Sequence, residues 1–443
     1  MKRPSIPTWI PTLALAIAVF VAVPLAKQTD TITVYWYQVI QVAAITAISA
    51  LGLNLIYGFN GQFSLGHVGF YAIGAYSSAL ITKDFTTQWS GSPTGALSWM
   101  IAGQLGMVLL LFLIQKLRLG ALRRRVIAAL EGNLASHEAR TLATLLNLII
   151  TAALIAVCVG VAWLLHKALV AILSSAVAAL PQSAAQALIF GLAIINGGTL
   201  AGLVAYVVGL PLLRLGSDYF GIATLGFAVM IYTALQNSDL VIETMKGARG
   251  MVAIPAWTTW PWVFGTLVIL IIVMRNMLRS THGRALISVR EDEIASQSMG
   301  IEVDQLKTVA FTVGCLYAGV AGALYAHLYG FLHPSTFNTI KGFDPLIIIV
   351  FGGLGSMTGT VLASIMFALV IEGLRVVLPK GFEDWRFVIY PIILLLIMLL
   401  RPRGLLGTSE WGWLRAPIPP ERDIPVPNRR LRTVDQPTPG EGK

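Results

Sequence analysis

The residues of this chain that could do chemistry are few, and four of them lie in one short polar stretch. Residues 58–76 read GFNGQFSLGHVGFYAIGAY and place Asn60, Gln62, Ser64 and His67 among five glycines. None of the four is an obligate charge, so together they can offer neutral hydrogen bonds. Acid–base or nucleophilic chemistry would need a charged or activated partner, and the stretch holds none.

Motifs for catalysis or cofactor binding are missing elsewhere in the sequence. No GxxxxGK[ST] phosphate loop, HExxH or GxSxG motif occurs, so an ATP site of that type and the common hydrolase sites gain no support. The two cysteines, Cys158 and Cys315, each lie in an apolar run without metal-ligand spacing. We therefore expect no catalytic residue, no metal site and no cofactor.

The elements that must position the polar stretch are apolar spans. Of the 443 residues, 56% are hydrophobic and only 12% are charged, against about 25% charged in soluble domains. Lysines and arginines cluster beside the apolar runs, so the net charge of +10 indicates orientation in a membrane rather than nucleic-acid binding. Composition therefore predicts an all-α polytopic membrane protein in a lipid bilayer, with a cytoplasmic N-terminus.

The apolar segments predict the number of crossings. Simple alternation of these spans leaves the Arg-rich C-terminal tail on the outer side, whereas its charge favours the cytoplasm. Segment 344–374 is interrupted by GGLGSMTG (352–359). A re-entrant element there would enter and leave on the same side of the membrane, which places the tail on the cytoplasmic side. We predict about ten transmembrane helices plus a Gly-rich broken or re-entrant segment near 344–374. The candidate spans are 8–26, 35–57, 63–82, 96–114, 141–165, 186–210, 219–236, 257–278, 306–330, 344–374 and 386–400.

The two glycine-rich stretches, 58–69 and 352–359, have two possible roles. Broken helices at membrane depth expose backbone N–H and C=O groups, which suit a solute that carries both charges. Alternatively, the glycines only let helices pack closely, with Ser64 and Asn60 as hydrogen bonds between helices. Under the first interpretation, both stretches line a path for a solute across the membrane. The predicted path residues are then Asn60, Gln62, Ser64, His67, Gly352, Gly353 and Gly355.

The segment THGRALISVREDEIASQSMGI (281–301) lies between two spans on the basic side. It is too short and too charged to span a bilayer, and it predicts a helix from Arg284 to Met299 that stops at Gly300. Ile287 and Ile294 share one face of this helix. Such a helix can dock into a groove of a soluble protein, or it can be an ordinary solvated loop helix.

Five blocks stand out in the order of the chain: GLNLIYGFNGQFSLGHVGFYAIGAY, LLRLGSDYFGIATLGFAVMIY, GRALISVREDEIASQSMGI, FGGLGSMTGTVL and LRPRGLLG. Together they resemble the permease subunit of branched-chain amino acid ABC importers of the LivM type. Five ordered blocks make a specific match, which covers about residues 36–82 and 205–407. Residues 115–185 depart from the compact family pattern.

The resemblance implies a heteromeric importer in the bacterial inner membrane. A second, LivH-like permease would pair with this chain, two cytoplasmic ABC ATPases would drive it, and a periplasmic substrate-binding protein would deliver the solute. The chain itself would be a multi-pass subunit without its own ATPase site, in agreement with the missing phosphate loop. The resemblance favours docking of segment 283–300 onto an ATPase, with the predicted coupling residues Gly283, Arg284, Arg290, Glu291, Asp292, Glu293 and Gly300.

The expected function is therefore to form half of the translocation path for branched-chain or similar hydrophobic amino acids. The same blocks do not distinguish a urea or short-amide permease of the same family. An ion-coupled secondary transporter is a different class, and it would need more acidic residues at mid-depth than Asp344 and Glu372, which lie near span ends.

These features divide the chain into four parts. Residues 1–114 hold N-terminal transmembrane helices, and residues 115–185 an inserted basic amphipathic and apolar helical hairpin, which we interpret as peripheral rather than catalytic. Residues 186–403 hold the core permease helices with the coupling segment 283–300. Residues 404–443 form a polar, Pro- and Arg-rich cytoplasmic tail.

Overall fold

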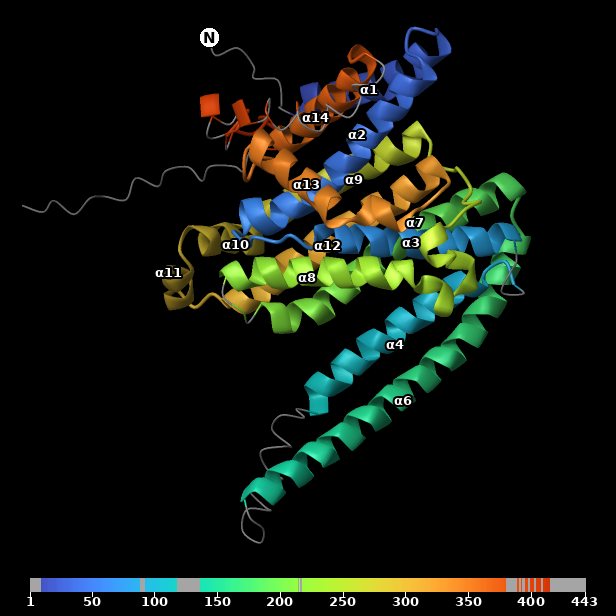
Figure 1. Cartoon of the computed structure of the whole chain (residues 1–443), viewed down its shortest axis with the longest axis vertical. Coiled ribbons are helices and arrows are strands. Elements are labelled where there is room, and N and C mark those ends of the chain that lie inside the picture. Colours follow the sequence, from blue (N-terminus) through green and yellow to red (C-terminus); the bar gives the residue numbers. More distant parts are fainter. Residues whose placement is uncertain are drawn as a thin grey trace, which may run out of the picture.

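A computed structural model shows a bundle of helices. The described residues hold no β-strand, apart from one isolated β-bridge between Met251 and Leu332. The helices are coloured and labelled along the chain in Figure 1. The structure describes residues 9–87, 92–117, 136–213, 215, 217–379, 389, 392, 395–396, 399–401, 404–407 and 409–414.

The longer helices are α1 (Trp9–Gln28), α2 (Val34–Leu53), α3 (His67–Thr87), α4 (Gly95–Leu117), α6 (Ser136–Ala178), α7 (Gln182–Leu212), α8 (Ser217–Gln236), α9 (Trp260–Arg279), α10 (Thr281–Glu291), α12 (Val303–Tyr329), α13 (Thr339–Gly352) and α14 (Met357–Val377). The shorter pieces are the π-helix η1 (Asn54–Phe59), helix α11 (Glu293–Ser298) and the 3-10 turns η2 (Ser238–Leu240), η3 (Glu243–Met245), η4 (Gly247–Arg249) and η5 (Pro334–Phe337).

Eight helices within the described residues are long and apolar enough to cross a membrane, which agrees with the predicted multi-pass all-α fold. The predicted count of about ten included α1, whose apolar part is shorter, α3, and residues 386–400, most of which lie outside the described residues. It assigned α14 to the re-entrant segment 344–374, whereas α14 is one of the eight helices long and apolar enough to cross. Helix α3 spans 21 residues but is more polar, and it occupies the centre of the bundle against α7 and α12.

Glycines bring the central helices into close contact. A Cβ at Gly74 of α3 would collide with the backbone of Gly319 in α12, and a Cβ at Gly52 of α2 would collide with the carbonyl oxygen of Gly314. Small residues at helix crossings allow close van der Waals packing, which matters where lipid gives helices no hydrophobic reason to associate. Gly74 lies outside the stretch 58–69 for which this packing role was considered, but within that stretch a Cβ at Gly66 would collide with the carbonyl oxygen of Thr224.

Helices α4 and α6 form an antiparallel pair that leans away from the bundle (Figure 1). Helix α6 runs without interruption through 43 residues and exposes most of its described apolar side chains. Residues 136–178 thus form one continuous helix rather than the two arms of a hairpin expected within residues 115–185, and this helix pairs with α4, most of which precedes residue 115. Residues 118–135 lie outside the described part of the chain.

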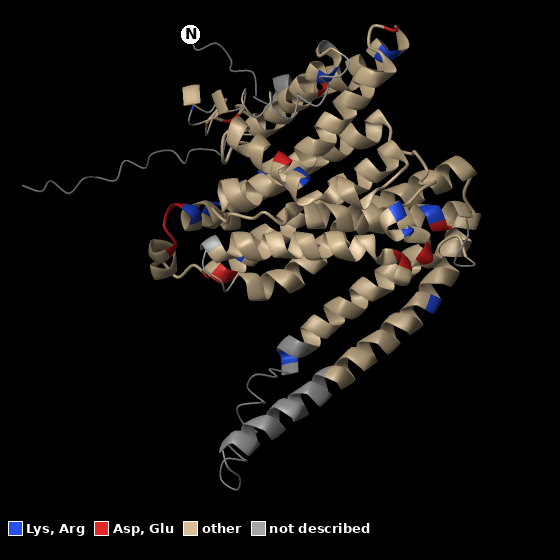
Figure 2. Cartoon of the chain, in the orientation of Figure 1, with Lys and Arg blue, Asp and Glu red and all other residues tan. Residues whose placement is uncertain are grey.

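The molecule has two distinct ends. Helices α10 and α11 lie at one end, and the turns η2–η4 lie at the other (Figure 1). Many of the charged residues lie toward these ends, and a basic and an acidic residue also lie close together along the helical body (Figure 2). This arrangement is expected for helices that cross a bilayer, because charges are costly within hydrocarbon.

Both predicted breaks are present. Helix α2 ends at Leu53, a π-helical turn follows, and the chain is non-helical at residues 60–66 before α3 begins. Helix α13 ends at Gly352 and α14 begins at Met357, so the second break lies at residues 353–356. Gly353 and Gly355 have positive φ angles of 113° and 82°, which other residues rarely adopt.

Candidate functional site

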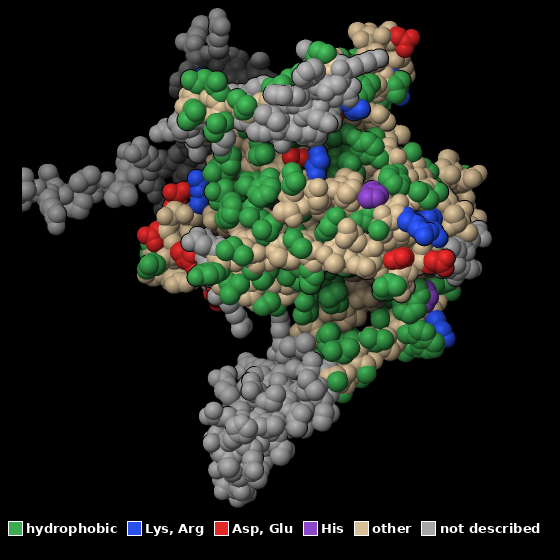
Figure 3. Space-filling view, in the orientation of Figure 1, with side chains coloured by type: hydrophobic (Ala, Val, Ile, Leu, Met, Phe, Trp, Pro, Cys, Tyr) green, Lys and Arg blue, Asp and Glu red, His purple; other side chains and the backbone are tan. Residues whose placement is uncertain are grey.

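A cavity of about 450 Å³ opens between α2, α12, α13 and α14. Its lining runs along α2 from Tyr35 to Ser49 and also comes from the first turns of α3, the last turns of α12, the start of α13 and the second half of α14, most of which lie away from α10. Apolar side chains cover most of the face viewed in Figure 3, with a basic and an acidic side chain visible between them. A cavity with this mixture of linings is a candidate solute site.

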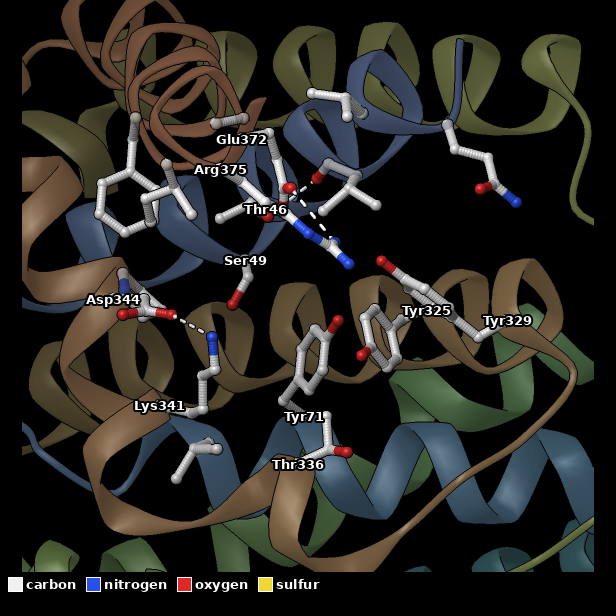
Figure 4. A pocket seen from close by; sticks show the side chains of 18 of the residues that line it. Thr46, Ser49, Tyr71, Tyr325, Tyr329, Thr336, Lys341, Asp344, Glu372 and Arg375 are labelled. Atoms are coloured by element: carbon white, nitrogen blue, oxygen red, sulfur yellow. Dashed lines mark hydrogen bonds and ion pairs between the residues drawn. The ribbon is translucent and has the colours of Figure 1, made fainter. Parts of the chain in front are cut away.

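Two ion pairs lie in the cavity wall (Figure 4). The Lys341 ammonium lies 3.5 Å from Asp344 on α13, and the Arg375 guanidinium lies 3.7 Å from Glu372 on α14. The Tyr35 hydroxyl donates a 2.5 Å hydrogen bond to Glu372. Each carboxylate therefore has a cation three residues away on its own helix, so neither is an isolated charge within the bundle.

Tyrosine hydroxyls and aliphatic side chains complete the cavity. The hydroxyls of Tyr71, Tyr325 and Tyr329 face its interior, and no hydrogen bond joins them to the other side chains drawn in Figure 4. The apolar part of the wall is formed by Val39, Val42, Val68, Pro345, Phe367, Ala368 and Ile371.

Residues 60–67 of the polar stretch lie next to this cavity without lining it. Ser49 and Val68 line the cavity, and the buried His67 Nε2 lies 2.9 Å from the carbonyl oxygen of Ser49. Gly61 packs against Arg290 of α10, so residues 60–67 lie along the chain between a contact with α10 and the cavity wall at Val68. We call these residues the floor segment.

The floor segment holds buried polar atoms that lack hydrogen-bond partners among the described residues. They are both side-chain polar atoms of Asn60, Gln62 Oε1, Ser64 Oγ and His67 Nδ1. All four residues are less than a tenth exposed. Each unpaired buried polar atom destabilises the folded state by about 1–3 kcal/mol, so this conformation of the floor segment must be stabilised by other contacts.

Asn54, at the start of η1, ties the two breaks together. Its Nδ2 donates to the Ser356 carbonyl at 3.0 Å and to Thr360 Oγ1 at 2.9 Å, and its Oδ1 accepts from the Gly355 N–H at 3.0 Å. The side chain is fully buried. This amide therefore pairs the Gly355 N–H, which the α13–α14 break would otherwise leave without a partner, and adds a donor to the Ser356 carbonyl, which also accepts from Thr360.

Arg290, the last basic residue of α10, contacts both breaks. Its Nη1 donates a 2.5 Å hydrogen bond to the carbonyl oxygen of Gly58, and it lies where a Cβ on Gly355 would be. Its side-chain stem packs against Gly61. This residue, predicted to belong to the docking surface, thus also links α10 to Gly61, at the start of the floor segment.

The rest of the predicted coupling segment faces outward. Glu291, Asp292, Glu293 and Arg284 are exposed, and so are the apolar side chains of α11. The single predicted helix is divided in two, because the Asp292 backbone is extended and its Oδ1 accepts the Ala295 N–H at 2.9 Å as an N-cap. Gly300 takes the predicted left-handed conformation, while Gly283 is buried against the end of α9.

The first residues assigned to the tail also belong to the site. The Glu410 carboxylate accepts the N–H groups of Met357 and Thr358 at the start of α14, which is where a negative charge is favoured. The Ser356 hydroxyl donates to the Ser409 carbonyl at 2.8 Å. Residues 404–407 and 409–414 therefore pack on the second break, whereas residues 415–443 lie outside the described part of the chain.

None of the predicted path residues lines the cavity. Asn60, Gln62, Ser64 and His67 lie in its floor, and Gly352, Gly353 and Gly355 lie at the second break, where a Cβ on Gly353 would collide with Gly407. Contact between these residues and a solute stays a prediction. The residues that sequence reasoning missed are Asn54, Tyr35, Tyr325, Tyr329, Lys341 and Arg375.

A signal for some of them was present in the sequence. Lys341 and Asp344, like Glu372 and Arg375, stand three residues apart beside apolar runs, a spacing that pairs charges on one helix face. The signal for Asn54 is weaker, since a single amide in an apolar run also fits a hydrogen bond between helices.

The sequence was also compared with known proteins. A family model described as branched-chain amino acid transport system / permease component matches residues 35–399. The chain belongs to this permease family. The match includes every element of the cavity, the floor segment and the coupling segment, and members of the family are permease components rather than catalytic subunits.

Curated relatives of this permease share moderate identity with it. The protein "High-affinity branched-chain amino acid transport system permease protein LivM" of Escherichia coli (strain K12) is 30% identical over 247 residues, which are 48% of this chain and 56% of the relative. LivH of the same strain is 27% identical over 195 residues, covering 40% of this chain and 61% of the relative.

A probable LivM of Methanocaldococcus jannaschii is 24% identical over 228 residues, covering 47% of this chain and 66% of the relative. The permease spans about half the length of the E. coli LivM it matches. No solved structure gives a significant match to it.

Proposed function

We propose that this chain is one permease subunit of an ATP-driven, binding-protein-dependent importer of branched-chain or similar hydrophobic amino acids in a bacterial inner membrane. A second, LivH-like permease, two cytoplasmic ATPases and a periplasmic binding protein would complete the importer. The family match and the names of the relatives support this proposal.

The observation that carries the mechanism is the contact of Arg290 with the floor segment. The cavity lies toward the end opposite α10, and in our proposal the floor segment closes it on the α10 side. A movement of α10 would be transmitted through Arg290 to Gly58 and Gly61, where the floor segment begins. In our proposal, ATPase movement displaces the floor segment, and its unpaired polar atoms become hydrated once the path opens.

Ion coupling is the competing mechanism, and the geometry of the acidic residues argues against it. A transporter coupled to protons or ions usually carries ionisable residues at membrane mid-depth, whereas the two carboxylates of this cavity lie near the ends of their helices. Asp344 and Glu372 each have a basic partner within 4 Å, as the two ion pairs above describe.

The energy source tests the proposal directly. In vesicles that contain the whole importer, we expect leucine uptake to continue when an ionophore collapses the ion gradients and to stop when ATP is removed. The physical reason is that hydrolysis on the partner subunits drives the floor movement. Uptake that follows the ion gradient and ignores ATP would refute the proposal.

Docking of the coupling segment has its own test. Ile294 on α11 is 77% exposed at the proposed ATPase-facing end, so Ile294→Glu should place a charge in the docking interface and reduce ATPase co-purification at least about tenfold. Leu240→Glu is the matched control, because Leu240 is 84% exposed at the opposite end. Equal ATPase retention by both variants would contradict docking at α11.

A further inference from the structure

The charges in the cavity need an explanation, because a path for an uncharged solute does not require them. Four charged side chains line the cavity at the start of α13 and the end of α14, between largely apolar helices. Urea and short amides hydrogen-bond well to tyrosine hydroxyls and backbone groups, which are already present. Paired charges of both signs are useful to a solute that itself carries both signs.

The Glu372–Arg375 pair has the properties needed to hold such a solute. The 3.7 Å separation is longer than the roughly 2.7–2.9 Å of a well-formed charged hydrogen bond, so the guanidinium keeps N–H groups for another acceptor. Half of the Arg375 side chain is exposed (51%), and Figure 4 shows its guanidinium extending into the cavity toward the hydroxyl of Tyr329. The Tyr35 hydrogen bond fixes the Glu372 carboxylate in place.

The remainder of the cavity fits the apolar part of an amino acid. Val39, Val42 and Ile371 line the cavity together with Glu372, and Phe367 extends the apolar wall along α14. A cavity of about 450 Å³ is large enough for a leucine-sized solute with some water.

We propose that this cavity binds one zwitterionic amino acid with a branched apolar side chain, and that the Glu372–Arg375 pair holds its head group. The solute carboxylate lies against the Arg375 guanidinium and the tyrosine hydroxyls, and its ammonium lies against the Glu372 carboxylate. The inference rests on the proposed function for its choice of solute, and it adds a solute site within this subunit itself.

Equilibrium binding of radiolabelled leucine to the purified full chain in lipid nanodiscs tests this site. Wild type should bind leucine saturably, whereas Arg375→Met and Glu372→Gln should each weaken binding at least about tenfold, since each removes a charged hydrogen bond to the solute. Glu243→Gln is the matched control, because Glu243 also pairs with a cation three residues away, at 3.8 Å and outside the cavity. Isoleucine should compete, while urea and isoamylamine, which lacks the carboxylate, should not.

Several outcomes would overturn the site: no saturable leucine binding, unchanged binding by both variants, or equal competition by urea. If Arg375→Met does not give monodisperse protein, Tyr325→Phe carries the test, because it removes one hydroxyl and should weaken binding a few-fold. Failure of the two proposals can be told apart. ATP-dependent uptake by an importer carrying both substitutions would refute the site alone, and leucine binding without ATP-dependent uptake would refute the proposed function alone.

Discussion

Arg290→Met is expected to abolish most solute uptake while leaving the ATPases bound. The substitution removes the hydrogen bond to the Gly58 carbonyl and the packing of the guanidinium on Gly355, but it leaves the exposed face of α10 and α11 intact. A coupling free energy of about 1–3 kcal/mol corresponds to about 5–150-fold, so we expect uptake to fall at least about tenfold. Uptake and ATP hydrolysis by the reconstituted importer are the measurements.

Arg284 provides the contrast on the same helix. Its guanidinium bonds only locally, to the Arg279 carbonyl and the Thr281 hydroxyl, and it faces outward. If it belongs to the docking surface, Arg284→Glu should release the ATPases, whereas Arg290→Met should retain them and uncouple hydrolysis from uptake. Normal uptake by Arg290→Met, or loss of the ATPases from it, would contradict a link through the floor segment.

Asn54→Ala is expected to have the largest effect on stability of any single amide in the described bundle. It removes three hydrogen bonds across the two breaks and leaves the Gly355 N–H unpaired. We expect a loss of about 2 kcal/mol or more, together with loss of uptake, because the two breaks are no longer held in register. The measurement is the midpoint of thermal unfolding of the purified chain in detergent.

Asn196→Ala is the matched control for that experiment. Asn196 is also buried, at 4% exposure on α7, but its Oδ1 has no hydrogen-bond partner among the described residues. Both substitutions remove the same atoms, so the difference between the two midpoints isolates the hydrogen bonds of Asn54. Equal midpoints would show that Asn54 does not hold the breaks together.

The sequence was most informative about the membrane and the two breaks. Apolar runs of about 20 residues leave few options other than spanning helices, since hydrocarbon offers no partner for unpaired backbone groups. Glycine clusters at residues 58–69 and 352–359 predicted interruptions, and both interruptions are present. The polar face of segment 281–301 was also correctly placed outside the spans, although Asp292 divides the predicted single helix into α10 and α11.

The sequence could not decide whether the polar stretch lines the cavity. Asn60, Gln62, Ser64 and His67 are neutral hydrogen-bonding residues in any arrangement, so their types could not tell a cavity wall from a cavity floor. That distinction depends on how α3 packs against α2, where the Ser49 carbonyl meets His67. The sequence likewise gave no reason for Arg290 to contact Gly58, because 232 residues separate them along the chain.

By itself, the sequence determined that this protein is a polytopic helical permease with glycine-rich breaks and a polar helical segment between spans. Those features follow from composition, local propensity and ordered blocks, which are properties of neighbouring residues. Only the tertiary structure decided which charges meet in the cavity and which polar atoms are sealed beneath it. The physical reason is that ion pairs, close glycine contacts and buried amides depend on distances between helices, and packing alone sets those distances.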